Sequence, residues 1–303
     1  SNYYEHAMTL AFGNNDIFHA KLGDVFDKLV PFWQLELYME YVLGNPENVD
    51  AQLLDAVIYA FVEINPDGTL YVPTPRFLRQ LVQLKLEKPS LQVIAAIGGW
   101  GTDGFSDAAS TPTSRYNFAR EAKKLMNQYG LDGIDIDWEY PGSSAAGIKS
   151  SPQDRENFTL LITALRDVLG DDAWLSVAGT GDSAYIRNSA EINKIAPLIT
   201  YFNLMSYDFT AGETGENARK HQANLYPSDL SLPGYSVDDM VNNLIEAGMP
   251  SEKILLGVPF YGRLGATVTK SYDDLRKDYI NKNGYEIAFD KQAQVPYLVK
   301  DGK

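Results

Sequence analysis

Short apolar runs alternate with amphipathic stretches from about residue 29 onward. Each run is brief and rich in β-branched or aromatic residues, which favours a buried strand over a helix. We therefore expect seven strands, at Leu29–Trp33, Ala56–Ile64, Leu91–Ile97, Gly133–Trp138, Trp174–Ala178, Ile199–Tyr207 and Ile254–Tyr261.

Between the runs, apolar residues recur at helical spacing. Two of these stretches, Phe118–Tyr129 and Phe158–Leu169, are each followed by a glycine, a common helix end. Ser236 is a suitable N-cap for a third helix, with Asp239 three residues later. Strand, helix, strand, repeated, indicates right-handed βαβ units and a parallel sheet.

The pattern predicts an α/β fold, a (β/α)8 TIM barrel with a small insertion after strand 7. An open doubly wound sheet fits less well, because no Gly-rich dinucleotide fingerprint follows any strand. We expect residues 1–28 to be an N-terminal lead, residues 29–263 to form the barrel and residues 264–303 to begin a small α+β insertion. An eighth strand is not visible, so we expect the natural chain to continue past Lys303 or residues 1–28 to close the sheet.

The composition of the chain limits the kinds of molecule that it is expected to bind. The formal net charge of -14 argues against nucleic acid and anionic membranes, which are recruited by an excess of Lys and Arg. The chain has no cysteine, which excludes disulfides and zinc–thiolate sites. No segment resembles a signal peptide or a membrane span, although a mature secreted protein would look the same.

Three acidic residues share one face of the strand at 133–138 and its extension. Side chains alternate along a strand, so Asp135, Asp137 and Glu139 point the same way. Pro141–Gly142 ends the strand and leaves Glu139 at the carboxyl-terminal mouth, where barrel enzymes keep their chemistry. The opposite face carries Ile134, Ile136 and Trp138.

Carboxylates about 7 Å apart on a buried strand cannot all be ionised at low cost. At least one should therefore titrate at raised pH, as part of a coupled set. Three interpretations stay open at this point: a catalytic acid cluster, a solvated acidic strand face, and a site for Mg²⁺ or Ca²⁺ with oxygen ligands.

Asp132-x-x-Asp135-x-Asp137-x-Glu139 resembles the DxxDxDxE signature of family 18 glycoside hydrolases, the chitinases and their relatives. The resemblance covers roughly residues 29–303. Further similar segments are Ile97–Trp100 (SxGGW, with Ala96 in place of serine), Asn203–Phe209 (sixth strand), Gly257–Arg263 (seventh strand) and Val295–Tyr297 (end of the insertion).

The resemblance implies a catalytic role for four residues. Glu139 would protonate the leaving oxygen and later activate water, with the substrate's own 2-acetamido oxygen as nucleophile. Asp137 would hold the acetamido N–H and stabilise the developing charge. Asp135 would keep Asp137 partly protonated, and Tyr207 would press the acetamido oxygen toward the anomeric carbon. Asp132 would brace the loop before the strand.

The resemblance also implies a sugar-binding cleft. Trp100, after the Gly98–Gly99 pair, would be a stacking platform. For Phe61 and Met205 taken alone, ordinary core packing is the alternative. The remaining implied pocket residues are Phe61, Tyr140, Met205, Asp208, Tyr261 and Arg263.

The function so implied is retaining hydrolysis of β-1,4-N-acetylglucosamine linkages in chitin or chitooligosaccharides, outside the cell, with no metal and no cofactor. Three alternatives remain: a lectin-like member of the fold, an endo-β-N-acetylglucosaminidase acting on N-glycans, and a metal-dependent barrel enzyme. The chain departs from the family pattern at two places. Leu29–Trp33 lacks the tyrosine that many members place near the catalytic acids, which puts the innermost hydrogen bonding in doubt. Ala96 removes a hydroxyl next to the aspartates, so we expect their titration to shift.

Overall fold

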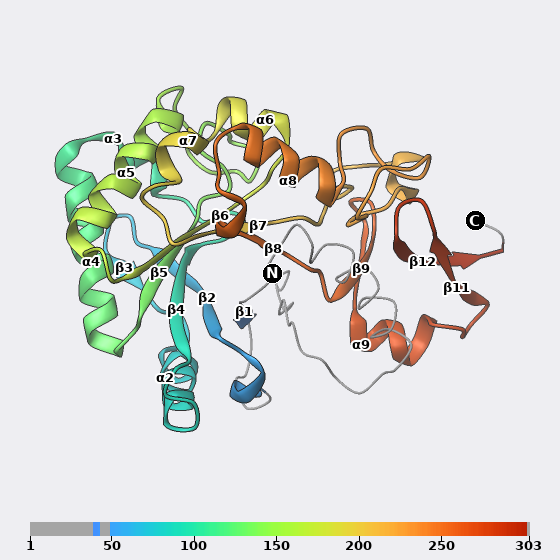
Figure 1. Cartoon of the computed structure of the whole chain (residues 1–303), viewed down its shortest axis with the longest axis horizontal. Coiled ribbons are helices and arrows are strands. Elements are labelled where there is room, and N and C mark those ends of the chain that lie inside the picture. The colour runs from blue at the N-terminus through green and yellow to red at the C-terminus, as the bar shows by residue number, and fades with distance from the viewer. Residues whose placement is uncertain (1–38, 43–48, 302–303) are drawn as a thin grey trace.

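The main sheet is parallel and follows the chain in order (Figure 1). The computed structural model describes the backbone of residues 39–42 and the whole of residues 49–301. Seven parallel strands pair in sequence order, and β3 (Leu70–Tyr71) adds an antiparallel edge to β2. The seven are β1 (Met39–Val42), β2 (Ala56–Ile64), β4 (Gln92–Gly98), β5 (Gly133–Asp137), β6 (Trp174–Gly179), β7 (Tyr201–Leu204) and β8 (Ile254–Leu256).

The TIM-barrel-like fold is confirmed, with β8 and β1 at the two unpaired edges of the described sheet. Six of the predicted strands are present. The predicted strand Leu29–Trp33 lies outside the described residues, and β1 lies where none was predicted, because a four-residue run that includes Glu40 gives too short a pattern.

The predicted strand Ile254–Tyr261 is in fact two separate strands. β8 ends at Leu256, and β9 (Tyr261–Leu264) begins a different sheet by pairing with β10 (Val268–Ser271). Pro259 lies between them, and proline cannot donate a ladder hydrogen bond. The single apolar run therefore leaves the barrel sheet partway along.

Helices cover the outer face of the sheet (Figure 1). Local signals fix their ends: Thr111 and Ser114 form a reciprocal capping box, Gly130 ends a helix in the left-handed conformation, and Ser236 accepts the Asp239 N–H at 3.0 Å. The helices are α2 (Pro75–Gln83), α3 (Phe105–Ser110), α4 (Pro112–Tyr129), α5 (Asp154–Leu169), α6 (Ser183–Asn188), α7 (Ile192–Ile195) and α8 (Val237–Glu246). In the part of the chain described, none is long and apolar enough to cross a membrane.

The two faces of β5 divide as the alternation predicts. Trp138, 1% exposed, stacks on Phe105 with ring centroids 5.3 Å apart and meets Phe158 edge-on at 5.8 Å. Ile134 and Ile136 join them in the large core under the helices. A smaller apolar cluster lies on the inner side of the sheet and contains Ala56, Ile58, Ala60, Ile94, Ala96 and Trp174.

Asp132 braces the start of β5, far from the mouth. Its carboxylate accepts two hydrogen bonds from Lys85 Nζ, at 2.6 and 2.7 Å, and one from the Val93 N–H at 2.7 Å. This acid therefore ties β4 and the turn after α2 to β5, as expected of a bracing residue.

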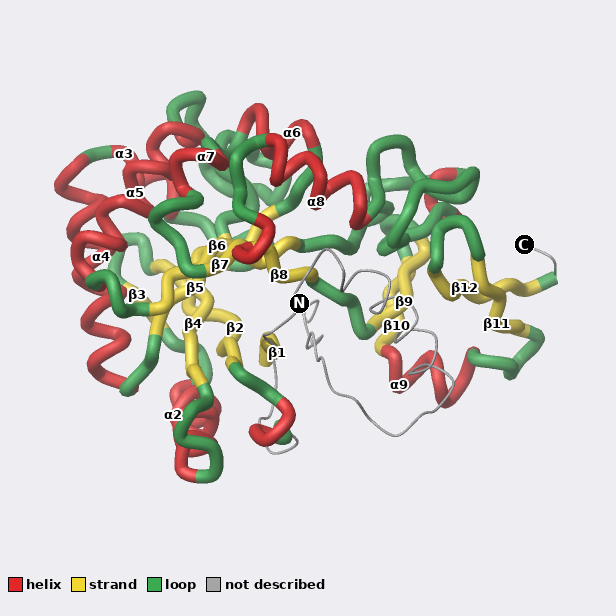
Figure 2. The backbone as a smooth tube through the Cα atoms, viewed as in Figure 1, coloured by secondary structure: helices red, strands yellow, loops and turns green. Residues whose placement is uncertain are grey.

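After β8 the chain forms two antiparallel hairpins (Figure 2). The first is β9–β10. The short α9 (Tyr272–Asp274) leads into a π-turn at Leu275–Tyr279, and the second hairpin follows. Its strands are β11 (Tyr285–Asp290) and β12 (Val295–Lys300). The boundaries proposed above for the lead, barrel and insertion stay predictions.

Hydrogen bonds join the turn of the second hairpin to the loop after β7. The backbone N–H groups of Leu225 and Tyr226 donate to the Ala293 carbonyl at 3.0 and 3.2 Å. Asp290 accepts from Ser228 Oγ at 2.8 Å and lies 3.0 Å from His221 Nε2. Burial alone would raise the pKa of Asp290, but hydrogen bonds from Ala293, His221 and Ser228 outweigh burial and hold it at about 2.

Candidate active site

The predicted carboxylates lie on the inner side of β5, two of them within the strand and the third just beyond its end. Asp135 is fully buried, Asp137 is 3% exposed, and Glu139 is partly exposed at the carboxyl-terminal mouth. Burial therefore decreases from Asp135 toward solvent. A substrate can reach the outermost acid and not the innermost one.

Asp135 is fixed by donors from two neighbouring strands. Ser176 Oγ on β6 donates to Asp135 Oδ1 at 2.6 Å, and Asn203 Nδ2 on β7 donates to the same oxygen at 2.8 Å. Trp174 Nε1 in turn donates to Ser176 Oγ at 3.1 Å. Asp135 is thus held by donors on β6 and β7, whereas Ala96 on β4 offers it no side-chain donor.

Asp137 and Glu139 are hydrogen-bonded to each other, so one of the two carboxyl groups carries a proton. Burial, followed by the charges of Glu139 and Asp135, raises the pKa of Asp137 well above its usual range. Burial raises the pKa of Glu139 to about 7, against hydrogen bonds from Tyr140, Asp137 and the Trp100 backbone that lower it. The two carboxyl groups therefore titrate as one coupled unit.

Two glycines let the end of β4 approach the acid strand. A Cβ on Gly98 would lie 2.0 Å from the Asp137 carbonyl oxygen, and one on Gly99 would lie 2.9 Å from the Phe61 ring. Both glycines also have positive φ values, 123° and 92°. A side chain on Gly98 would push β4 away from β5, and one on Gly99 would displace the Phe61 ring, so the site's geometry requires both glycines.

Aromatic side chains form one wall of the mouth. Trp100 is 43% exposed, and its ring meets Tyr140 edge-on with centroids 6.3 Å apart. Phe61 is partly exposed and packs on Gly99. An exposed indole beside a buried acid is the arrangement expected of a sugar-stacking platform rather than of core packing.

The opposite wall comes from the segment after β7 and from β9. The Tyr207 and Tyr261 rings meet edge-on at 6.4 Å, and Arg263 Nε donates to Asp208 Oδ1 at 2.6 Å. Met205, the residue after β7, is only 8% exposed. Tyr207 and Asp208 of this segment are thus joined to Tyr261 and Arg263 of β9.

The profile of the family "Glycosyl hydrolases family 18" matches residues 34–303 of this chain. The chain belongs to family 18. Chitinase A1 from Niallia circulans is 34% identical over 258 residues, which make up 73% of this chain and 37% of that protein. Chitotriosidase-1 from Mus musculus is 32% identical over 250 residues, or 78% of this chain and 52% of that protein. The chain therefore spans less than two thirds of these relatives.

Solved family 18 structures agree with this assignment. The chitinase domain of the spore coat protein CotE from Clostridium difficile has a TM-score of 0.79 at 77% identity, covering 87% of this chain and 76% of that one. A family 18 N-acetylglucosaminidase from Paenibacillus barengoltzii has a TM-score of 0.74 at 33% identity, covering 82% and 79% of the two chains.

Sequence reasoning missed several residues that hold this family 18 site. Asp154 is fully buried and accepts hydrogen bonds from Ser106 Oγ at 2.8 Å and the Ser151 N–H at 2.7 Å, so it holds the loop that follows Glu139. In the sequence, Asp154 is only an acidic residue at the start of a helix, and such residues usually stabilise the helix end. The other missed residues are Ser176, Asn203 and Tyr185.

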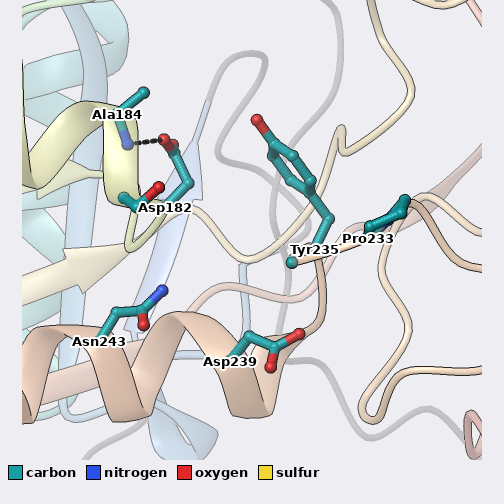
Figure 3. Close-up of a pocket in the computed structure, with 8 residues that line it drawn as sticks. Asp182, Ala184, Pro233, Tyr235, Asp239 and Asn243 are labelled. Carbon is teal, nitrogen blue, oxygen red and sulfur yellow. Dashed lines mark hydrogen bonds between the residues drawn. The ribbon is translucent and has the colours of Figure 1, made fainter.

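A separate hollow of about 300 Å³ lies where α6 and α8 begin (Figure 3). Its carboxylates are used as helix caps. Asp182 accepts from the Ala184 and Tyr185 N–H groups at 2.8 and 3.1 Å, and Asp239 accepts from Ser236 Oγ at 2.7 Å. Because both carboxylates already accept hydrogen bonds at the helix ends, we interpret the hollow as a feature of helix packing and not as a functional site.

Within residues 39–42 and 49–301, no group of three or more His, Asp or Glu side chains is arranged to hold a metal ion. The acids of β5 are instead held by hydrogen bonds to each other and to neighbouring strands. Their arrangement fits proton transfer at the mouth.

Proposed function

We propose that this chain hydrolyses β-1,4 linkages between N-acetylglucosamine units of chitin or its oligosaccharides, with retention at the anomeric carbon. The observation that carries the proposal is the hydrogen-bonded Asp137–Glu139 pair, which holds one proton at the mouth of the barrel. The family match and the chitinase names of similar proteins support it.

In the first step Glu139 gives its proton to the glycosidic oxygen as the bond from that oxygen to C1 breaks. The acetamido oxygen of the same sugar attacks C1, and a cyclic oxazolinium ion forms. Asp137 accepts the acetamido N–H and stabilises the positive charge on the ring, a preorganised electrostatic contribution. Tyr207, on the facing wall, holds the acetamido oxygen in line with C1.

In the second step Glu139 is a base. It takes a proton from water, the resulting oxygen attacks C1 from the face that the leaving group occupied, and the oxazolinium ring opens. The acid is thereby regenerated, and two displacements at C1 leave its configuration unchanged.

The walls of the site would bind sugars on either side of the cleaved bond. Trp100 offers an exposed aromatic face to the C–H surface of a pyranose ring. Asp208 and Arg263, paired at 2.6 Å, offer polar partners opposite it. Chitin is an insoluble polymer, so we place the activity outside the cell.

We expect the rate of hydrolysis to fall as pH rises through about 7. The acid must hold its proton to protonate the leaving oxygen, and the pKa of Glu139 is about 7. The kcat/KM of oligosaccharide cleavage, measured from pH 4 to 9, tests this. A rate that stays level to pH 9 would show that Glu139 does not supply the proton.

Product analysis separates this function from its alternatives. We expect chitin oligosaccharides to be shortened while a high-mannose glycoprotein keeps its glycans. Release of the glycans, with chitin oligosaccharides untouched, would assign the chain to N-glycan cleavage. Binding of chitin without cleavage of either substrate would assign it to the lectin-like members of the fold.

A further inference from the structure

Tyr185 on α6 is a buried tyrosine whose hydroxyl has no hydrogen-bond partner among the described residues. Its side chain is 4% exposed. The ring meets Tyr140 and Phe202 edge-on, with centroids 5.8 and 6.3 Å away. A phenylalanine would make the same contacts without burying an unpaired hydroxyl, which is costly. Packing explains the ring and leaves the hydroxyl unexplained.

The hydroxyl lies at the catalytic end of the sheet. A Cβ on Gly179, the last residue of β6, would lie 2.4 Å from it, so this glycine leaves the space that the hydroxyl occupies. β6 pairs with β5 through Asp135 and Ser176, which brings the end of β6 beside Asp137. Asp182 accepts the Tyr185 N–H at 3.1 Å and fixes the start of α6, beside the hollow in Figure 3.

Asp137 has a matching unpaired atom. One oxygen of this buried carboxyl interacts with Glu139, and Oδ1 has no hydrogen-bond partner in the described part of the chain. After burial, the charge of Asp137 is the largest cause of the raised pKa of Tyr185, so the phenol stays protonated and able to donate. Asp137 interacts electrostatically with these titratable groups: Asp135, Glu139, Tyr140, Tyr185 and Tyr207.

We propose that Tyr185 is a positioning residue for the hydrolysis proposed above: its hydroxyl donates a hydrogen bond to Asp137 Oδ1, directly or through one water molecule, while Asp137 is charged. As Glu139 gives its proton to the leaving oxygen, negative charge is left on the pair. A fixed donor stabilises that charge and holds Asp137 in the orientation that meets the acetamido N–H. The inference rests on the proposed function.

The test is Tyr185→Phe. We expect kcat on chitin oligosaccharides to fall about tenfold with KM unchanged, because the bond strengthens only as charge develops. A donor to a charged carboxylate lowers its pKa, so losing the donor raises it, and the acid limb of the kcat profile moves to higher pH. The melting temperature should not fall, since no hydrogen bond of the resting protein is lost.

Tyr59→Phe is the matched control. Tyr59 is also buried, at 3% exposed, but its hydroxyl lies 2.7 Å from Thr74 Oγ1 on the helix side of β2. Its loss should lower the melting temperature and leave kcat and the acid limb unchanged. The two variants therefore separate an effect on stability from an effect on the acid pair.

A Tyr185→Phe variant with parental kcat and an unmoved acid limb overturns the inference. If the unaltered chain does not cleave chitin oligosaccharides, the proposed function fails, and the titration of Asp137 then decides the inference. Followed by ¹³C NMR and assigned with Asp137→Asn, a higher Asp137 pKa in Tyr185→Phe supports the hydrogen bond. An unchanged pKa rejects it.

Discussion

Glu139→Gln should retain sugar binding and lose turnover, with kcat lower by about 10²–10⁴-fold. Glutamine keeps the size and polarity of the side chain but cannot give a proton to the leaving oxygen. Of Asp135, Asp137 and Glu139, only Glu139, just beyond the end of β5, lies at the mouth, so the other two acids cannot take over the transfer. Rates on chitin oligosaccharides, with affinities from calorimetry on the same ligands, measure the two effects separately.

Glu156→Gln is a suitable control for this experiment. Glu156 is exposed in the first turn of α5 and is not among the residues that form the site, so this variant should match the parent in both rate and affinity. A Glu139→Gln variant that hydrolyses at near-parental rates would show that the proton comes from another group.

Substrates without an acetamido group should not be cleaved at all. Asp137 and Glu139 are hydrogen-bonded neighbours on one strand, so both approach the sugar from the same side. A two-carboxylate retaining enzyme needs its nucleophile across the ring from its acid, and this pair does not provide one. We expect no cleavage of cellulose oligomers or fully deacetylated glucosamine oligomers under conditions in which chitin oligosaccharides are consumed.

The same mechanism predicts competitive inhibition by a thiazoline analogue of the oxazolinium ion. Asp137→Asn should weaken that inhibition, because the carboxylate would contact the ring nitrogen of the inhibitor. Efficient cleavage of cellulose oligomers, or a sugar trapped covalently on a protein carboxylate, would rule out the acetamido group as nucleophile.

The sequence predicted those parts of the fold that depend on local alternation. Ile134, Ile136 and Trp138 are buried under the helices and the acids of β5 face inward, because a period of two leaves no other arrangement for a strand buried on both sides. The point at which the chain leaves the barrel was not predicted. Apolar residues occur on both sides of Pro259, and the pairing shows that the strands before and after it belong to different sheets.

The site was predicted where its residues lie next to each other in sequence. The support of Asp135 was not, because its donors Ser176 and Asn203 are 41 and 68 residues away. Ser176 does not stand out in its own segment, and Asn203 begins a family-like segment but had no predicted role. Tyr185 has the spacing of any buried helical residue, and its unpaired hydroxyl is visible only in three dimensions.

The hydrogen bonds between the second hairpin and the loop after β7 make the stability of the protein depend on pH. The lowered pKa of Asp290 adds stability that is fully present above the ordinary value of 3.8 and is lost as pH falls through about 2. The raised pKa of Glu139 acts in the opposite sense: its contribution is fully present below 4.5 and is lost as pH rises through about 7. Both contributions are complete only between 3.8 and 4.5, so mild acid favours the junction and the catalytic pair together.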